Sequence, residues 1–322
     1  MMSATPPRSR APFGIDPAAL GIACCVISAL GYTGSNICLR QLAGDEVSYI
    51  MTICVKELVA VAVVGPWLIG EWLRGKRLFP GLPTLGLLVV VGLAVQLVGN
   101  VGQQFAFGTV GLAVTVPIVL CLMLTTAPLL GRVVLKERVS HRTVGALALL
   151  IASILALSIG AGQDAETTAQ PARWLAAWAV LAASAAGVTY ATLTVTIRST
   201  VTRGVPQMVV VFVTTGVGAL SLGLLSLREA GLDPWRTLPA HHLTWMLASG
   251  ALNLIAFVAI TKGLQLTSVV NVNLLNASQV AMAAVAGVVL FGEPNTFWLR
   301  VGVAMTIAGM ILIDRRLPAA EA

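Results

Sequence analysis

The chain has 322 residues, of which 57% are hydrophobic and 10% are charged, with 20 Lys and Arg against 13 Asp and Glu. Soluble globular domains carry about 25% charged residues, and so few charges cannot cover this much apolar surface in water. The composition therefore excludes a soluble enzyme, a nucleic-acid-binding protein and a disordered chain, and it predicts a protein that lies in the lipid bilayer.

Long uncharged runs predict helices that span the membrane. Residues 78–131 and 263–292 carry no Asp, Glu, Lys or Arg, and a helix needs about 20 residues to cross about 30 Å of hydrocarbon. Continuously apolar runs exclude a β-barrel, whose strands alternate between apolar and polar residues. We predict an all-α integral membrane protein with ten transmembrane helices, near residues 18–39, 47–69, 84–106, 112–135, 143–159, 175–197, 207–227, 243–266, 269–291 and 297–313.

The basic residues predict how these helices are oriented. Fourteen Lys and Arg fall in one set of alternating loops and five in the other, and the richer set is expected in the cytoplasm. With ten spans, both termini then face the cytoplasm. Arg outnumbers Lys 16 to 4, which points to a bacterial source with GC-rich DNA and hence to the cytoplasmic (inner) membrane.

An internal repeat divides the chain into two halves. An offset of 156 residues aligns Gly31 with Gly187, Gly131 with Gly287, and Glu137 with Glu293. Five spans per half is an odd number, so the second copy enters the membrane inverted, as in secondary transporters. The expected organisation is a cytoplasmic segment at 1–17, a five-helix repeat at 18–160, an extracytoplasmic connector at 161–173 and an inverted repeat at 174–315.

Each half combines a first helix rich in small residues with a fourth helix that ends in a short apolar segment and a glutamate. These segments are Val134-Leu135-Lys136-Glu137 and Leu290-Phe291-Gly292-Glu293. Over roughly residues 18–315 this pattern resembles EamA-type members of the drug/metabolite transporter superfamily. The resemblance implies a bundle around a central cavity that moves small metabolites. We expect Glu137 and Glu293 to be structural, each near the N-terminus of the next helix.

Lys56 and Glu57 are the only charged residues deep in a predicted span. Lys56 lies about 13 Å along its helix, where a charge costs about 3 kcal/mol or more on insertion scales and marks a functional pathway. Adjacent residues point about 100° apart, so each of the two is expected to have its own environment. We predict that Lys56 attracts a substrate carboxylate or phosphate and that Glu57 carries any proton coupling. A structural role for both stays open.

Polar amides form a second group. On the predicted ninth helix three amides share an arc of about 120°, and four on the third helix share a similar arc, whereas their repeat-mates are mostly apolar. Fold-preserving residues should recur in both copies, so this asymmetry favours substrate contact over interhelical hydrogen bonding. Tyr32 and Asn36 lie four apart on the first helix, with Tyr190 on its mate. The predicted substrate-binding residues are Lys56, Asn276, Gln279, Gln96, Asn100, Asn273, Tyr32 and Asn36.

The favoured function is secondary transport of a small polar or amphipathic metabolite, such as an amino acid or another carboxylate, by alternating access. A flippase for a lipid-linked substrate on the same scaffold stays open, because a midplane lysine also suits a lipid phosphate. A channel or a membrane-embedded enzyme is disfavoured. The three histidines fall in predicted loops and no metal-ligand spacing occurs, so no catalytic residue, metal or cofactor is predicted. The expected partners are the substrate and the bilayer, and a homodimer stays open.

Overall fold

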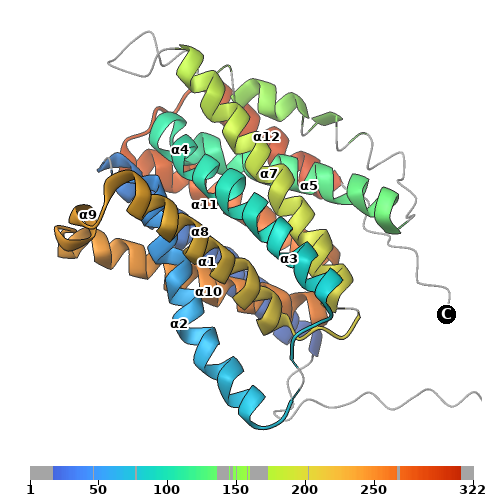
Figure 1. Ribbon diagram of the computed structural model, residues 1–322. Helices are drawn as coiled ribbons and strands as arrows, with labels where there is room; N and C mark the ends of the chain where they lie inside the picture. Colours follow the sequence, from blue (N-terminus) through green and yellow to red (C-terminus); the bar gives the residue numbers. More distant parts are fainter. Residues whose placement is uncertain are drawn as a thin grey trace, which may run out of the picture.

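The computed structural model describes residues 17–45, 47–76, 78–135, 145, 148–149, 151–157, 159, 173–201, 203–266 and 269–312. All elements in these ranges are helices (Figure 1). They are α1 (Pro17–Gly44), α2 (Tyr49–Leu73), α3 (Leu82–Ala94), η1 (Val95–Asn100), α4 (Val101–Val110), α5 (Leu112–Leu135), α7 (Arg173–Val201), α8 (Gln207–Ala230), α9 (Asp233–Arg236), α10 (Ala240–Leu266), α11 (Val269–Phe291) and α12 (Phe297–Leu312).

Among the described residues, six helical segments are long and apolar enough to cross a membrane: α1, α2, the continuous run α3–η1–α4, α7, α8 and α10. Shorter apolar stretches lie in α5, α11 and α12. The bounds of α5 and α11 coincide with the predicted spans, and those of the other helices differ by at most five residues. The predicted fifth span, 143–159, is described only in part, as helix at 151–157.

One predicted loop is wrong in its bounds. The predicted spans leave residues 228–242 in a loop, but α8 continues to Ala230, α9 interrupts the connection, and α10 begins at Ala240. His241 and His242 therefore lie in the first turn of a helix. Polar residues at a helix end remain compatible with the helix where it leaves the membrane, so charge alone does not mark its boundary.

The third predicted span contains a π-helical turn, η1, which the sequence did not predict. It lies between α3 and α4, and the three segments follow one another without a gap as one continuous helix. Gly99 lies in this turn, where an added Cβ would come within 2.7 Å of the Thr189 hydroxyl on α7. The turn therefore brings the backbone close to α7. Such π-turns inside α-helices are frequent at functional sites.

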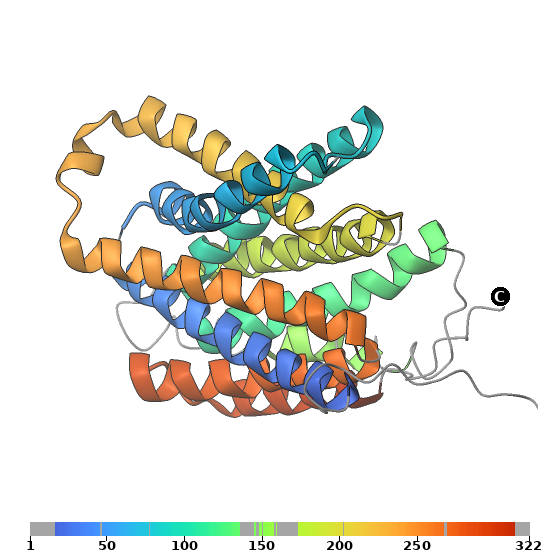
Figure 2. The ribbon, with the colours of Figure 1, turned by 90° about the horizontal axis from the view of Figure 1, so that it is seen from below.

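The helices pack as pairs drawn from the two halves of the chain (Figure 2). Helix α1 lies along α10 and α11, α2 lies along α8, and α5 lies along α7, whereas α12 contacts α5 and α11. Glycines permit close approaches at these crossings, as two of them show. A Cβ on Gly31 would lie 3.0 Å from the Leu252 carbonyl of α10, and one on Gly187 would lie 2.5 Å from the Val119 carbonyl of α5. Small residues at such crossings are typical of membrane helices.

Glu293 holds the turn between α4 and α5 from the other half of the chain. Its Oε1 accepts hydrogen bonds from the Leu112 N–H (2.7 Å) and from Arg40 Nε (2.9 Å), and its Oε2 accepts one from the Ala113 N–H (2.8 Å). Gly111 has φ +80°, and an added Cβ would lie 2.5 Å from the carboxylate. Only glycine fits there, because the backbone is left-handed and the space is filled.

The expected place of Glu293 is therefore wrong. The sequence predicted it near the N-terminus of the helix that follows it, α12, and the structure places it at the N-terminus of α5. Because α11 packs against α5, the residues that follow α11 reach the start of α5. A carboxylate is favourable at either helix start, since both present free N–H groups. Glu137, the repeat-mate of Glu293, lies outside the described residues.

Replacing Glu293 with Ala is expected to destabilise the protein by about 2–3 kcal/mol. The change removes the acceptor for two backbone N–H groups and leaves Arg40, whose side chain is 18% exposed, without its partner. Thermal unfolding in detergent measures the loss. Glu293→Gln, which keeps an acceptor oxygen, should lose less, and the exposed Glu229→Ala should change little. Equal midpoints for Glu293→Ala and Glu229→Ala would contradict this role.

Candidate functional site

Lys56 and Glu57 form a buried ion pair on α2. Lys56 Nζ lies 2.9 Å from Glu57 Oε1, and the two side chains are 4% and 3% exposed. The expectation that the two residues have separate environments is therefore wrong. The Cα–Cβ directions differ by about 100°, but the four-carbon side chain of lysine is long and flexible enough to reach round the helix. The centre of the site is therefore an ion pair whose charges balance, and not an isolated cation.

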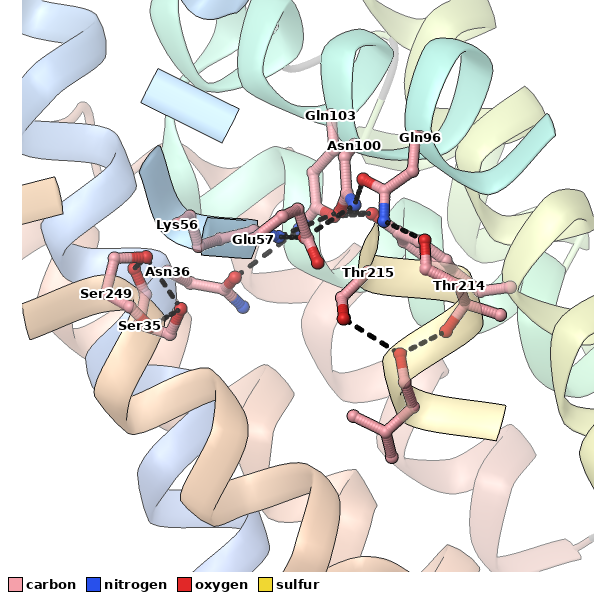
Figure 3. Close-up of polar contacts among 12 residues, drawn as sticks. Ser35, Asn36, Lys56, Glu57, Gln96, Asn100, Gln103, Thr214, Thr215 and Ser249 are labelled. Carbon is pink, nitrogen blue, oxygen red and sulfur yellow. Dashed lines mark hydrogen bonds and ion pairs between the residues drawn. The ribbon is translucent and has the colours of Figure 1, made fainter. Parts of the chain in front are cut away.

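Asn100 of η1 binds both members of the pair. Its Oδ1 accepts a hydrogen bond from Lys56 Nζ at 3.1 Å, and its Nδ2 donates to Glu57 Oε1 at 3.3 Å and to Gln96 Oε1 at 2.6 Å (Figure 3). The Tyr190 hydroxyl of α7 lies 2.8 Å from the same Oδ1. A buried ion pair loses hydration, and hydrogen bonds to its remaining lone pairs and protons offset that cost. Asn100 supplies one such bond to each charge.

The network continues to three further helices. Gln96 Nε2 donates to the Thr214 carbonyl of α8 at 3.3 Å. The Tyr190 hydroxyl also lies 2.6 Å from Gln103 Oε1. Because a hydroxyl has one proton, it donates a hydrogen bond to either Asn100 or Gln103, and not to both at once. Gln103 Nε2 in turn donates to Asn36 Oδ1 of α1 at 3.5 Å. The network therefore joins α1, α2, the η1–α4 segment, α7 and α8, which come from both halves of the chain.

The network lies nearer one end of the helices than the other. Lys56 follows the first residue of α2 by seven positions, about 10 Å along the helix, and Asn100 precedes the end of α4 by ten positions, about 15 Å. These two helix ends lie together, since an added Cβ on Gly108 would lie 2.9 Å from the Tyr49 hydroxyl. At the same level Ser35 Oγ of α1 lies 2.9 Å from Ser249 Oγ of α10.

Half of the predicted substrate-binding residues meet in this network, together with Glu57, the residue predicted for proton coupling. Lys56, Glu57, Gln96, Asn100 and Asn36 are joined by the bonds above. The network leaves Asn36 and Asn100 half-buried, and Tyr32, also half-buried, lies within electrostatic range of Glu57.

The binding residues predicted on the ninth span, Asn273, Asn276 and Gln279, are not among those joined by the bonds above. Gln279 is buried on α11. Asn273 and Asn276 belong to the same helix, and their side chains lie outside the described residues. Whether any of these side chains contacts substrate stays a prediction.

Two residues are more central than the sequence indicated. The sequence singles out Tyr190 only as a tyrosine on the repeat-mate of the first helix, and Gln103 only as one of the four amides on the third predicted span. Gln103 shares its arc with Asn100, so the periodicity carried a usable signal for it. Tyr190 carried none, because one tyrosine in an apolar helix also suits packing, and its partner Asn100 lies 90 positions away.

The second half does not repeat the network. At the offset of 156 residues, Lys56 corresponds to Phe212, Gln96 to Leu252 and Asn100 to Ala256. Leu252 and Ala256 instead pack against Gly31 of α1. The polar network on α2 and η1 thus has an apolar counterpart on α8 and α10. This is the asymmetry expected where one copy keeps a ligand contact and the other serves packing.

Comparisons with known proteins relate the second half of the chain to a family of transporters. Residues 177–314 match the EamA-like transporter family. Among 25 matching chains of solved structures, one described only as a protein crystal structure superposes with a TM-score of 0.59 over 91% of this chain and 96% of that one, at 18% identity. At this identity the match shows a shared fold. No curated protein sequence matches the chain significantly.

Proposed function

Because residues 177–314 form a domain of the EamA-like transporter family, we propose that the chain is a secondary transporter that moves a small polar metabolite by alternating access. The family is one of membrane transporters of the drug/metabolite type, and not of enzymes. The observation that carries the proposal is the Lys56–Glu57 pair with its hydrogen-bonded amides. A charged pair inside a membrane helix is costly and marks a substrate or ion pathway.

The proposed architecture is ten membrane spans in two inverted repeats, with both termini in the cytoplasm. Three features support it: the family match covers the second half, the basic residues favour one set of loops, and the packing is related by exchange of the halves. When the two halves are exchanged, the contact of α1 with α10 corresponds to the contact of α7 with η1 and α4. In the same way, the contact of α1 with α11 corresponds to the contact of α7 with α5. The contacts α2–α8 and α5–α11 each join a helix to its own repeat-mate, so the exchange leaves them unchanged. In this orientation the polar network lies nearer the extracytoplasmic side.

The charge balance of the site favours a zwitterionic substrate such as an amino acid. Lys56 and Glu57 neutralise each other in the structure. A substrate carboxylate that takes Lys56 leaves Glu57 as a buried, unpaired charge, which costs several kcal/mol. The ammonium group of a zwitterion can pair with Glu57 at the same time, so both charges exchange partners and none is left alone. A simple monoanion instead requires a proton on Glu57.

Counterflow into proteoliposomes tests this proposal. Internal substrate is expected to accelerate uptake of labelled external substrate, because a carrier returns faster when loaded. Amino acids should exchange at rates nearly independent of pH between about 6 and 8, whereas the matching carboxylic acids without the amino group should exchange faster at low pH, with proton uptake. Protein-free liposomes are the control. Uptake without acceleration by internal substrate would indicate a channel and overturn the proposal.

A further inference from the structure

Three potential metal ligands meet where α1 ends and α10 begins. Asp45 directly follows α1, and His241 and His242 lie in the first turn of α10. They are close because α1 packs along α10. Asp45 and His241 are 196 positions apart in the chain, so no sequence motif predicts this group. It belongs to the end of the bundle near α9 (Figure 1).

The geometry of the three residues approaches that of a metal site. His242 Nε2 lies 3.3 Å from Asp45 Oδ2, the two imidazole rings have centroids 4.0 Å apart, and one ligand atom of each residue lies within 4.8 Å of the others. Two ligand atoms bound tetrahedrally to one Zn²⁺ lie roughly 3.4 Å apart. The His242–Asp45 pair already has this spacing. His241 is exposed, so its ring can rotate through the remaining distance.

The ligand types point to a particular class of cation. Two imidazole nitrogens and one carboxylate oxygen suit Zn²⁺ and similar divalent transition metals and leave a further position for water. Ca²⁺ and Mg²⁺ prefer sets made only of oxygen. Gln41 Nε2 lies 3.2 Å and 3.4 Å from the two carboxylate oxygens of Asp45. This hydrogen bond holds the carboxylate in place, as outer partners of metal ligands commonly do.

We propose that Asp45, His241 and His242 form a binding site for a zinc-like divalent cation, which ties the end of α1 to the start of α10. The site differs from the Lys56 network and does not depend on transport. A bound cation would link a helix of the first half to one of the second half, across an interface that otherwise contains Gly31 and the Ser35–Ser249 hydrogen bond. Binding to the folded state alone raises thermal stability.

Calorimetric titration of tag-free, EDTA-treated protein with Zn²⁺ tests the site. One Zn²⁺ per chain should bind and raise the unfolding midpoint, whereas Mg²⁺ should do neither. His242→Ala and Asp45→Asn should each weaken Zn²⁺ binding at least 10-fold and remove the thermal shift. His141→Ala, which removes the third histidine of the chain, is the matched control and should bind as the unchanged protein does. Equal affinity in all four proteins would overturn the assignment.

Discussion

Lys56→Ala is expected to lower transport at least 100-fold. The change removes the positive charge that we assign to the substrate carboxylate, together with the donor to Asn100 Oδ1. It also leaves Glu57, whose side chain is 3% exposed, as an unpaired buried charge. Breaking a buried pair in this way costs about 3–5 kcal/mol unless the carboxylate takes up a proton. Initial rates of counterflow measure the loss of transport, and thermal unfolding in detergent measures the loss of stability.

A double variant separates these two effects. Lys56→Met with Glu57→Gln removes both charges and leaves neither alone, so it should unfold close to the unchanged protein while still failing to transport. Gln104→Leu is the matched control. Gln104 lies four residues after Asn100, is buried, and donates to the Leu39 carbonyl at 2.8 Å and not to the network. It should keep transport. Normal counterflow by the double variant would remove Lys56 from the substrate site.

The positions of the helices could be predicted from the sequence because the bilayer imposes them. An apolar run of about 20 residues forms a helix in hydrocarbon, and this is enough to place α5 and α11 at their observed bounds. The π-turn η1 could not be predicted. It depends on how Gly99 and Asn100 meet Thr189 and Tyr190 of α7, and these contacts join residues about 90 positions apart.

The candidate site was found from the cost of burying charge and amides in a membrane. Lys56, Glu57, Gln96 and Asn100 were selected on that ground, and the structure brings them together. The connection between them was predicted wrongly, because helical geometry gives the direction of Cβ and not the reach of a lysine side chain. The same limit applies to Glu293, whose partners Leu112 and Ala113 come from the other half of the chain.

The ion pair changes what the lysine can do. An isolated buried lysine would attract any anion, whereas a lysine already paired with Glu57 binds an anion only if Glu57 gains another positive partner. That partner is a proton for a monoanion and the substrate's own ammonium group for a zwitterion. Substrate selection and proton coupling are then two consequences of one requirement, that the buried site stays neutral.

Glu57→Gln is expected to reverse the substrate preference. Without the carboxylate, Lys56 is left without its ion-pair partner, so a monoanion restores neutrality by itself and no proton is needed. A zwitterion instead brings an ammonium group that no longer has a partner. The ratio of monoanion to amino-acid exchange should rise at least 10-fold, which corresponds to about 1.4 kcal/mol. Exchange of the monoanion should lose its pH dependence, and a pH gradient should no longer drive its accumulation.

Glu71→Gln is the matched control for this experiment. Glu71 is the other buried carboxylate described on α2, and it pairs with Arg74 and Lys76 near the end of the helix, away from the network. Its variant should keep the amino-acid preference and the pH dependence of monoanion exchange. If a pH gradient still drives accumulation of a monoanion by the Glu57→Gln protein, protons do not pass through Glu57. If it also exchanges amino acids at the original rate, Glu57 does not bind the ammonium group, and the neutral-site explanation fails.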